Sequence, residues 1–140
     1  MKKIIYDSWI ARNLLFKDHT TITLTAFVCT RYKSEAEMPQ AIRNHECTHA
    51  RQWFEMFLLG FFVVFVLQIP FDISSWWYLL PFFAFYLWYL LEVAIRSIMI
   101  WGNAYKYVSF EREARENQYD NNYLGNCNYF SWVKYYGKNN

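Results

Sequence analysis

Two long apolar segments in the middle of the chain limit the folds open to it more than any other feature. The first, WFEMFLLGFFVVFVLQI, covers residues 53–69, and the second covers residues 76–101. As helices rising ~1.5 Å per residue they would be about 25 Å and about 39 Å long, against a bilayer hydrocarbon core of roughly 30 Å. Both segments are therefore long enough to be membrane spans, although the first is a little short.

The link between the two segments predicts a helical hairpin. Residues 70–75, PFDISS, combine a helix-stopping proline with an acid and two serines, which is typical of a tight turn. In the second segment Glu92 and Arg96 are four residues apart and can pair on one helical face. Glu55 in the first segment fits either headgroup depth or a site on its own helix. A helical hairpin buried in a soluble domain would carry the same apolar pattern, and this alternative stays open.

The placement of positive charge favours a membrane. Of the 14 Lys and Arg residues, eight lie at or before Arg51 and six at or after Arg96, so none lies between residues 52 and 95. Aromatic residues stand at both ends of the predicted hairpin, where membrane interfaces favour them. By the positive-inside bias, we expect an integral membrane protein with a two-helix hairpin, both termini in the cytoplasm and membrane lipid as a partner.

Composition excludes several other classes. A chain of 140 residues suits a single domain. The net charge of +2, without a basic stripe between aromatics, gives no support to nucleic-acid binding. Cys29, Cys47 and Cys127 form no CxxC pattern, so we expect reduced thiols rather than a disulfide framework. Asp7 and Arg12 interrupt the N-terminal apolar stretch, which we interpret as mature sequence rather than a signal peptide.

The segments on either side of the hairpin predict a mainly α fold with a small N-terminal β element. Residues 20–30, TTITLTAFVCT, alternate as a half-buried strand does, and their threonine face suggests a sheet edge. Pro39 suits the start of a helix that continues into the first apolar segment, and another helix is predicted from Ser109. We divide the single domain into an N-terminal strand region, a helix with the first span, a second span, and a helix with an aromatic tail: 1–38, 39–69, 76–101 and 109–140.

Residues 43–53, RNHECTHARQW, contain the spacing HExxH. On a helix, His45 and His49 share a face and can present both imidazoles to one ion, with Glu46 beside them. Zinc held in this way lowers the pKa of a bound water, and Glu46 can accept the proton as that water attacks a carbonyl. The third histidine, His19, is interpreted as a loop residue.

A third zinc ligand must come from elsewhere, because catalytic zinc takes three protein ligands and keeps one position open. The segment SFEREAREN supplies Glu111 and Glu113 after the second apolar segment. If the hairpin crosses a membrane twice, these glutamates return to the side that holds His45 and His49. Alone, this segment would be interpreted as an exposed charged helix. Next to HExxH, it predicts the missing ligand.

The motifs together resemble a known class. HExxH with a later helix containing Glu-x-Glu-Ala resembles the gluzincin zinc metallopeptidases. The set NHECTHARQ, LWYLLE and SFEREAREN resembles small bacterial membrane-associated HExxH proteins of unassigned activity, over roughly residues 35–120. The resemblance implies one zinc ion on two histidines and a later glutamate, with a glutamate as base: His45, His49, Glu111 and Glu46.

The register of the third ligand is the open point of this resemblance. In the gluzincin pattern Glu-x-x-Ala-Asp the first acid binds the metal and the last supports a histidine, which assigns Glu111. Arg115 stands where the pattern has Asp. A cation cannot accept the histidine N–H bond, so the alternative register of Glu113 with Asn117 stays open.

We therefore expect a zinc-dependent metallopeptidase that hydrolyses a peptide or protein substrate at the cytoplasmic membrane face. The threonine-rich strand would hold an extended substrate by edge pairing. Gln52, one turn after His49, could hydrogen-bond the site or be an interfacial amide. Tyr119 or Tyr123 could stabilise an oxyanion, but with 12 tyrosines in the chain neither is singled out. One alternative is a non-catalytic small membrane protein with a structural or vestigial zinc site that acts through partner binding. Another is a soluble or peripheral hydrolase with the hairpin as its core.

Overall fold

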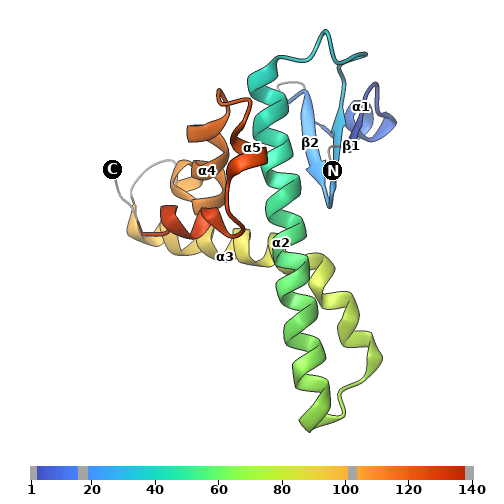
Figure 1. Cartoon of the computed structure of the whole chain (residues 1–140), viewed down its shortest axis with the longest axis vertical. Coiled ribbons are helices and arrows are strands. Elements are labelled where there is room, and N and C mark those ends of the chain that lie inside the picture. Colours follow the sequence, from blue (N-terminus) through green and yellow to red (C-terminus); the bar gives the residue numbers. More distant parts are fainter. Residues whose placement is uncertain (1–2, 16–18, 101–103, 138–140) are drawn as a thin grey trace.

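A computed structural model describes residues 3–15, 19–100 and 104–137 (Figure 1). The fold is mainly helical with a small N-terminal sheet, as the sequence predicts. In chain order the elements are β1 (Lys3–Ile5), α1 (Trp9–Leu14), β2 (Thr21–Leu24), β3 (Phe27–Thr30), α2 (Gln40–Phe71), the 3-10 helix η1 (Ser75–Phe83), α3 (Ala84–Met99), η2 (Ala104–Tyr107), α4 (Ser109–Asn117), α5 (Tyr123–Asn126) and η3 (Ser131–Tyr135). Trp101, the expected end of the second span, lies outside the described residues.

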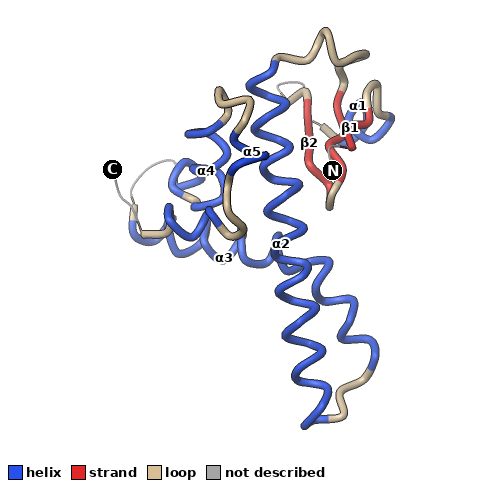
Figure 2. The backbone as a smooth tube through the Cα atoms, in the orientation of Figure 1, coloured by secondary structure: helices blue, strands red, loops and turns tan. Residues whose placement is uncertain are grey.

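The N-terminal sheet has the order β1-β3-β2, with β1 parallel and β2 antiparallel to β3 (Figure 2). The sequence predicted one strand over residues 20–30, and the structure divides it into a hairpin. Thr25 causes the division, because its φ of 58° is left-handed and its N–H leaves the ladder to donate to the Tyr86 hydroxyl at 2.8 Å. The threonine-rich half, β2, is an edge strand, as its pattern suggested.

Helix α2 is a single helix that contains both the HExxH motif and the first apolar segment. It begins directly after Pro39 and ends at Phe71, where Asp72 adopts the left-handed conformation and donates its N–H to the Gln68 carbonyl. The first half of α2 lies between the sheet and α4 (Figure 1). Its second half extends away from this body and is accompanied by η1 (Figure 1).

By length and composition, two helical stretches among the described residues could cross a membrane: Gln40–Phe71 and Ser75–Met99. The second differs from the straight antiparallel partner expected from the sequence. After η1 returns along α2, α3 turns and runs across α2 at the foot of the body (Figures 1 and 2). The indole of Trp53 donates to the Phe82 carbonyl at this bend, at 3.1 Å.

Close packing holds the bend against α2. A Cβ atom placed on Gly60 would lie 3.3 Å from Pro81 Cα, which is tighter than ordinary contact. The missing side chain at Gly60 therefore allows η1 to approach α2 closely. Pro81, which lacks a backbone N–H, is compatible with the 3-10 geometry at this point.

The body is held together by aromatic packing around Phe110, the second residue of α4. Phe110 is fully buried, and its ring centroid lies 4.8 Å from that of Phe85 on α3 and 4.6 Å from that of Trp132 on η3. This packing sets the rotation of α4 about its axis. It therefore determines which neighbour of Phe110 faces α2.

The predicted pair of Glu92 and Arg96 is present, with Nη2 3.5 Å from Oε1, and both side chains are buried in the body. The Glu92 carboxylate also accepts hydrogen bonds from the Ser109 N–H at 2.9 Å and the Ser109 hydroxyl at 2.6 Å. A carboxylate here satisfies the free N–H group of Ser109 at the start of α4. The contact fixes where α4 begins, as the sequence predicted at Ser109.

Candidate metal centre

Three side chains from α2 and α4 converge in the body. His45 and His49 lie one turn apart on α2, with 3.1 Å between their Nε2 atoms. Glu111, on the first turn of α4, places Oε1 3.4 Å from Nε2 of His45 and Oε2 3.3 Å from Nε2 of His49. Together they form a group that could hold a metal ion.

The geometry of this group fits zinc. Three ligands each about 2.0–2.1 Å from an ion at tetrahedral angles lie about 3.3 Å from one another. The three distances between ligand atoms run from 3.1 to 3.4 Å. Oε2 of Glu111 is buried without a hydrogen-bond partner, which is unfavourable unless a cation lies there. Two imidazoles and a carboxylate are also a donor set that suits zinc.

Glu113, the alternative third ligand, lies outside this group. Its Oε2 accepts a hydrogen bond from the Gln52 amide at 2.7 Å, and its Oε1 accepts one from the Tyr123 hydroxyl at 2.6 Å. Asn117 donates to the Glu113 carbonyl at 2.8 Å rather than supporting a histidine. The structure thus brings Glu111, and not Glu113, to the two imidazoles.

The orientation of His49 is set by Gln52 from the same helix. The amide nitrogen of Gln52 donates both to Glu113 and to the Phe110 carbonyl, at 2.7 and 3.0 Å, so the amide oxygen must be the atom that faces His49. Nδ1 of His49 lies 2.8 Å from that oxygen and therefore carries the proton. Its Nε2 is the nitrogen that faces Glu111, so this nitrogen is the one that could bind a metal ion once it is deprotonated.

Gln52, and not a residue of α4, is the hydrogen-bond partner of the His49 ring at Nδ1. Arg115, which occupies the Asp position of the gluzincin pattern, lies with Nη2 3.4 Å from Oε1 of Glu111. The histidine is therefore supported from α2 rather than directly from α4. The sequence marked Gln52 only as one possible hydrogen-bond partner.

Burial and neighbouring charges together shift the pKa values of the three side chains. Burial disfavours the Glu111 carboxylate, but contact with His49 and the charges of both imidazoles lower the pKa of Glu111 to about 2. Burial lowers the pKa of His49, but Glu111 and Glu46 raise it more, so the net shift is upward. Burial and the neighbouring His49 lower the pKa of His45. Glu111 is therefore ionised at neutral pH, and a metal ion would compete with a proton for Nε2 of His49.

Glu46 faces the edge strand. Its Oε1 accepts a hydrogen bond from the Thr21 hydroxyl at 2.8 Å, and its Oε2 accepts one from the Thr23 hydroxyl at 2.6 Å. Both threonines lie on β2, one on each side of Ile22. The threonine face of the strand is thus turned to the glutamate that the HExxH spacing singles out.

A different tyrosine from the two considered in the sequence stands at the site. Tyr119 is 80% exposed, and Tyr123 is bound to Glu113. Tyr105 on η2 interacts with Glu111 instead, and burial together with the charge of Glu111 raises the pKa of Tyr105 to about 12. No sequence signal separates Tyr105 from the other tyrosines, because the contact depends on η2 folding back towards α2.

The C-terminal segment packs against the side of α2. Arg51 donates to the carbonyls of Leu124 and Cys127, at 3.0 and 2.9 Å, and pairs with Glu55 at 3.0 Å. Glu55 also accepts the Phe130 N–H at 3.0 Å. The environment of Glu55, which the sequence left open, is therefore the protein body.

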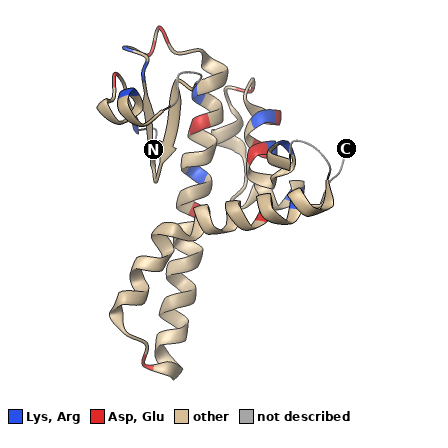
Figure 3. Ribbon diagram, turned by 180° about the vertical axis from the view of Figure 1, so that it is seen from behind, with Lys and Arg blue, Asp and Glu red and all other residues tan. Residues whose placement is uncertain are grey.

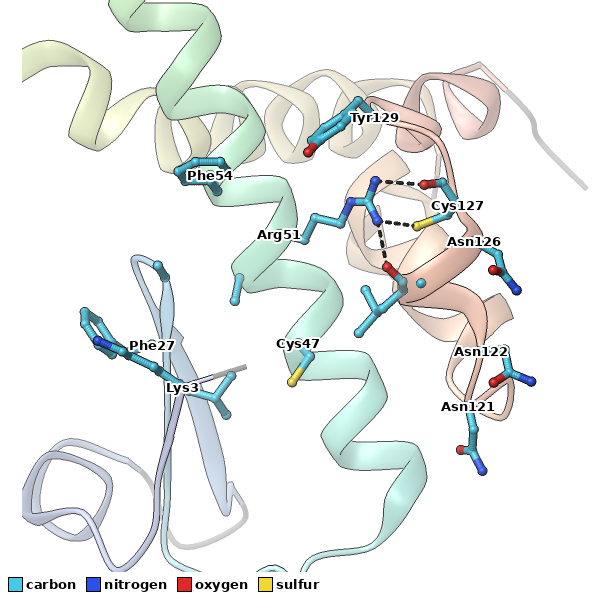
Figure 4. Close-up of a pocket in the computed structure, with 15 residues that line it drawn as sticks. Lys3, Phe27, Cys47, Arg51, Phe54, Asn121, Asn122, Asn126, Cys127 and Tyr129 are labelled. Carbon is cyan, nitrogen blue, oxygen red and sulfur yellow. Dashed lines mark hydrogen bonds between the residues drawn. The ribbon is translucent and has the colours of Figure 1, made fainter. Parts of the chain in front are cut away.

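A cavity of about 800 Å³ lies between the sheet and this C-terminal segment (Figure 4). Its wall on α2 includes Cys47, Arg51 and Phe54, which occupy the face of the helix opposite His45 and His49. No side chain of the metal-binding group lines it. The cavity is therefore separate from the candidate metal centre.

Comparisons of the chain with protein-family models, with curated proteins and with solved structures found no match. The resemblance to gluzincins therefore stays an expectation from the sequence motifs. Within the described residues, no fourth His, Cys, Asp or Glu joins the group. A tetrahedral ion bound there would keep one position for water or substrate.

Proposed function

We propose that the protein is a zinc-dependent metallopeptidase that hydrolyses peptide bonds at the cytoplasmic face of a membrane. The observation that carries the proposal is the convergence of His45, His49 and Glu111 within 3.1–3.4 Å of one another. Structural zinc sites use four protein ligands, whereas catalytic sites use three. A three-ligand group therefore favours catalysis over a structural or vestigial zinc site that serves partner binding.

The side chains around the group have separate duties in this proposal. Zinc, when bound, supplies a Lewis acid that lowers the pKa of a water ligand and polarises a carbonyl. Glu46 accepts the proton of the attacking water and returns it to the leaving amine. Thr21 and Thr23 hold the two carboxylate oxygens of Glu46 in place. Tyr105, protonated at neutral pH, is a donor for the developing oxyanion.

The exposed surface of the hairpin supports the membrane part of the proposal. In each candidate span, only 17% of the most apolar stretch of 18 residues is buried within the protein. A hairpin that formed the core of a soluble hydrolase would be mostly buried. An apolar surface of this extent requires another environment, which a lipid bilayer provides. The positive-inside bias then assigns both termini to the cytoplasm.

The test is zinc content and hydrolysis of the purified protein with Glu46→Gln. We expect wild type and variant to hold about one zinc per chain, and the variant to hydrolyse a mixture of quenched fluorescent peptides at least about a hundredfold more slowly. Glu116→Gln, at an exposed glutamate on α4, is the matched control and should behave as wild type. Wild type without zinc, loss of zinc in Glu46→Gln, or unchanged hydrolysis in that variant would each refute the assignment.

A further inference from the structure

The bend after η1 leaves a short hairpin below the body. Below this bend the hairpin consists of the last part of α2, from Gly60 to Phe71, together with η1. Twelve helical residues extend about 18 Å, against a hydrocarbon core of roughly 30 Å. Residues 84–99 of the second segment lie in α3, which runs across α2 (Figure 1).

One face of α3 is turned towards the body. Phe85, Glu92 and Arg96 are buried there. Glu92 binds Ser109 of α4, and the Arg96 guanidinium lies 5.9 Å from the Tyr136 ring centroid. The two charged groups of α3 are thus directed into the protein.

The opposite face of α3 is apolar and exposed. Its large exposed side chains are Leu87, Leu90, Leu91 and Ile98, with Ile95 and Met99 exposed at its edge. Charged residues are concentrated on the body, and the hairpin below has an acidic residue only at its turn, Asp72 (Figure 3). Polar Gln68 within the hairpin accepts a hydrogen bond from the Tyr78 hydroxyl. The exposed face of α3 and the surface of the hairpin are therefore both apolar.

Lipid accounts for this surface better than a second copy of the chain. Phe61, Phe62 and Val63 are consecutive on α2, so they point about 100° apart, and all three are exposed. A partner protein packed against one side would cover one stripe of the hairpin. A bilayer surrounds it on every side.

We propose that α3 lies in the plane of the membrane interface, with Leu87, Leu91 and Ile98 among the acyl chains and the α2–η1 hairpin inserted beneath it. A helix with one apolar face and one polar face adopts this position at a bilayer surface. Residues 76–99 then do not form a second span that runs parallel to α2.

This arrangement sets the distance of the metal centre from the lipid. The buried face of α3 touches the site directly, because the ring centroids of Phe85 and His49 are 6.3 Å apart. A helix with its side chains is about 10 Å across, so the centre would stand roughly one helix diameter above the acyl chains. The inference about substrates rests on the proposed peptidase function. The substrates are peptide segments that lie on the membrane surface or emerge from it.

The experiment compares two pairs of spin-labelled cysteines in the full chain, reconstituted in vesicles of phosphatidylcholine and phosphatidylglycerol. Leu91→Cys and Ile98→Cys lie seven residues apart on the exposed face of α3, and their native side chains are 52% and 84% exposed. Phe62→Cys and Ile69→Cys have the same spacing on α2, where the native side chains are 62% and 76% exposed. Wild type treated with the same reagent measures labelling of the native cysteines.

Depth is read from collisions with a lipid-soluble and a water-soluble relaxation agent. We expect the α2 pair to differ in depth by about 10 Å and the α3 pair to lie at nearly equal depth. A difference of about 10 Å in the α3 pair would overturn the proposal, because α3 would then cross the bilayer. Labels on α3 that meet only the water-soluble agent, or that are shielded from both agents, would overturn it as well.

The depth measurement needs neither zinc nor hydrolysis, so its failure is separate from failure of the peptidase assignment. The substrate class is tested on one peptide supplied with and without an acyl anchor. We expect hydrolysis of the anchored peptide to be at least about tenfold faster, because anchoring raises its effective concentration at the site. Equal rates would refute the restriction to membrane-surface substrates.

Discussion

The side-chain oxygen of Gln52 lies 2.8 Å from Nδ1 of His49, one turn earlier on the same helix. This contact turns the other imidazole nitrogen to Glu111. The Gln52 amide nitrogen in turn binds Glu113, so α4 contributes both a candidate ligand and a support for the helix that bears the histidines. The strength of metal binding should therefore depend on residues that do not touch the ion.

Gln52→Ala should weaken zinc binding by about 10- to 100-fold, the usual effect of removing a hydrogen bond to a metal-binding histidine. Titration against a chromophoric chelator measures the affinity. Gln118→Ala, a truncation of the glutamine at the end of α4, serves as the control and should bind zinc as wild type does. An unchanged affinity in Gln52→Ala would show that His49 is oriented by other contacts.

Glu111→Ala should abolish stoichiometric zinc binding, because it removes one of three ligands. Glu113→Ala should keep the metal with a weaker affinity, since Glu113 acts through Gln52. Metal analysis of both variants beside Glu116→Ala, at an exposed glutamate of the same helix, measures the difference. The opposite order, with zinc lost only from Glu113→Ala, would assign the ligand to the other register.

Replacing Thr21 and Thr23 by Val should slow hydrolysis by about 10- to 100-fold while zinc content stays at one per chain, because hydrogen bonds to a charged group contribute about 1.5–3 kcal/mol. Valine keeps the branched shape and removes the hydroxyl groups that hold Glu46. Serine at both positions keeps the hydroxyls and should restore most of the rate. If the serine variant is as slow as the valine variant, the hydroxyl groups do not position Glu46.

The stability of the zinc-free protein should depend on pH through His49 and Glu111. The pKa of Glu111 is lowered from 4.5 to about 2, so its contribution is complete above pH 4.5 and is lost as the pH falls towards 2. The pKa of His49 is raised from 6.5, so its contribution is complete below pH 6.5 and is lost at higher pH. The pair should therefore stabilise the fold most between pH 4.5 and 6.5.

Thermal unfolding of chelator-treated protein between about pH 3 and 8, for wild type and Glu111→Gln, measures this dependence. The difference between the two melting temperatures should be largest within the stated window. A difference that keeps growing above the window would mean that His49 does not supply the charge that faces Glu111.

Gly60→Leu should lower the free energy of unfolding by about 1–3 kcal/mol, the usual effect of overpacking. A Cβ at Gly60 would already lie 3.3 Å from Pro81 Cα and 3.5 Å from Ala84 Cβ, so a larger side chain must push η1 away from α2. Gly125→Leu is the matched control, because a Cβ there would meet no atom within 4 Å. Equal unfolding curves for the two variants would show that the bend does not depend on this contact.

Parts of the site that depend on a single helical turn were predictable from the sequence. The shared face of His45 and His49, with Glu46 beside it, follows from 3.6 residues per turn. The start of α4 at Ser109 was also predictable, and so were the two long apolar helical segments joined by a turn. Each of these features involves residues close together in the chain.

Other parts depend on how the elements pack. The choice between Glu111 and Glu113 depends on the rotation of α4, which the burial of Phe110 and the contact of Ser109 with Glu92 determine. Likewise, nothing in the sequence distinguishes Tyr105 from the other tyrosines. The turn of the second apolar segment away from α2 could not be foreseen either.

The sequence by itself determined the chemistry available to this protein: two imidazoles and a carboxylate on one helix, further carboxylates on a later helix, and an apolar hairpin between them. Only the tertiary structure decided which later carboxylate meets the imidazoles, and that α3 lies across α2 instead of along it. The physical reason is that helical periodicity acts over a few residues. Contacts between α2 and α4 join residues about sixty positions apart and depend on side-chain packing throughout the body.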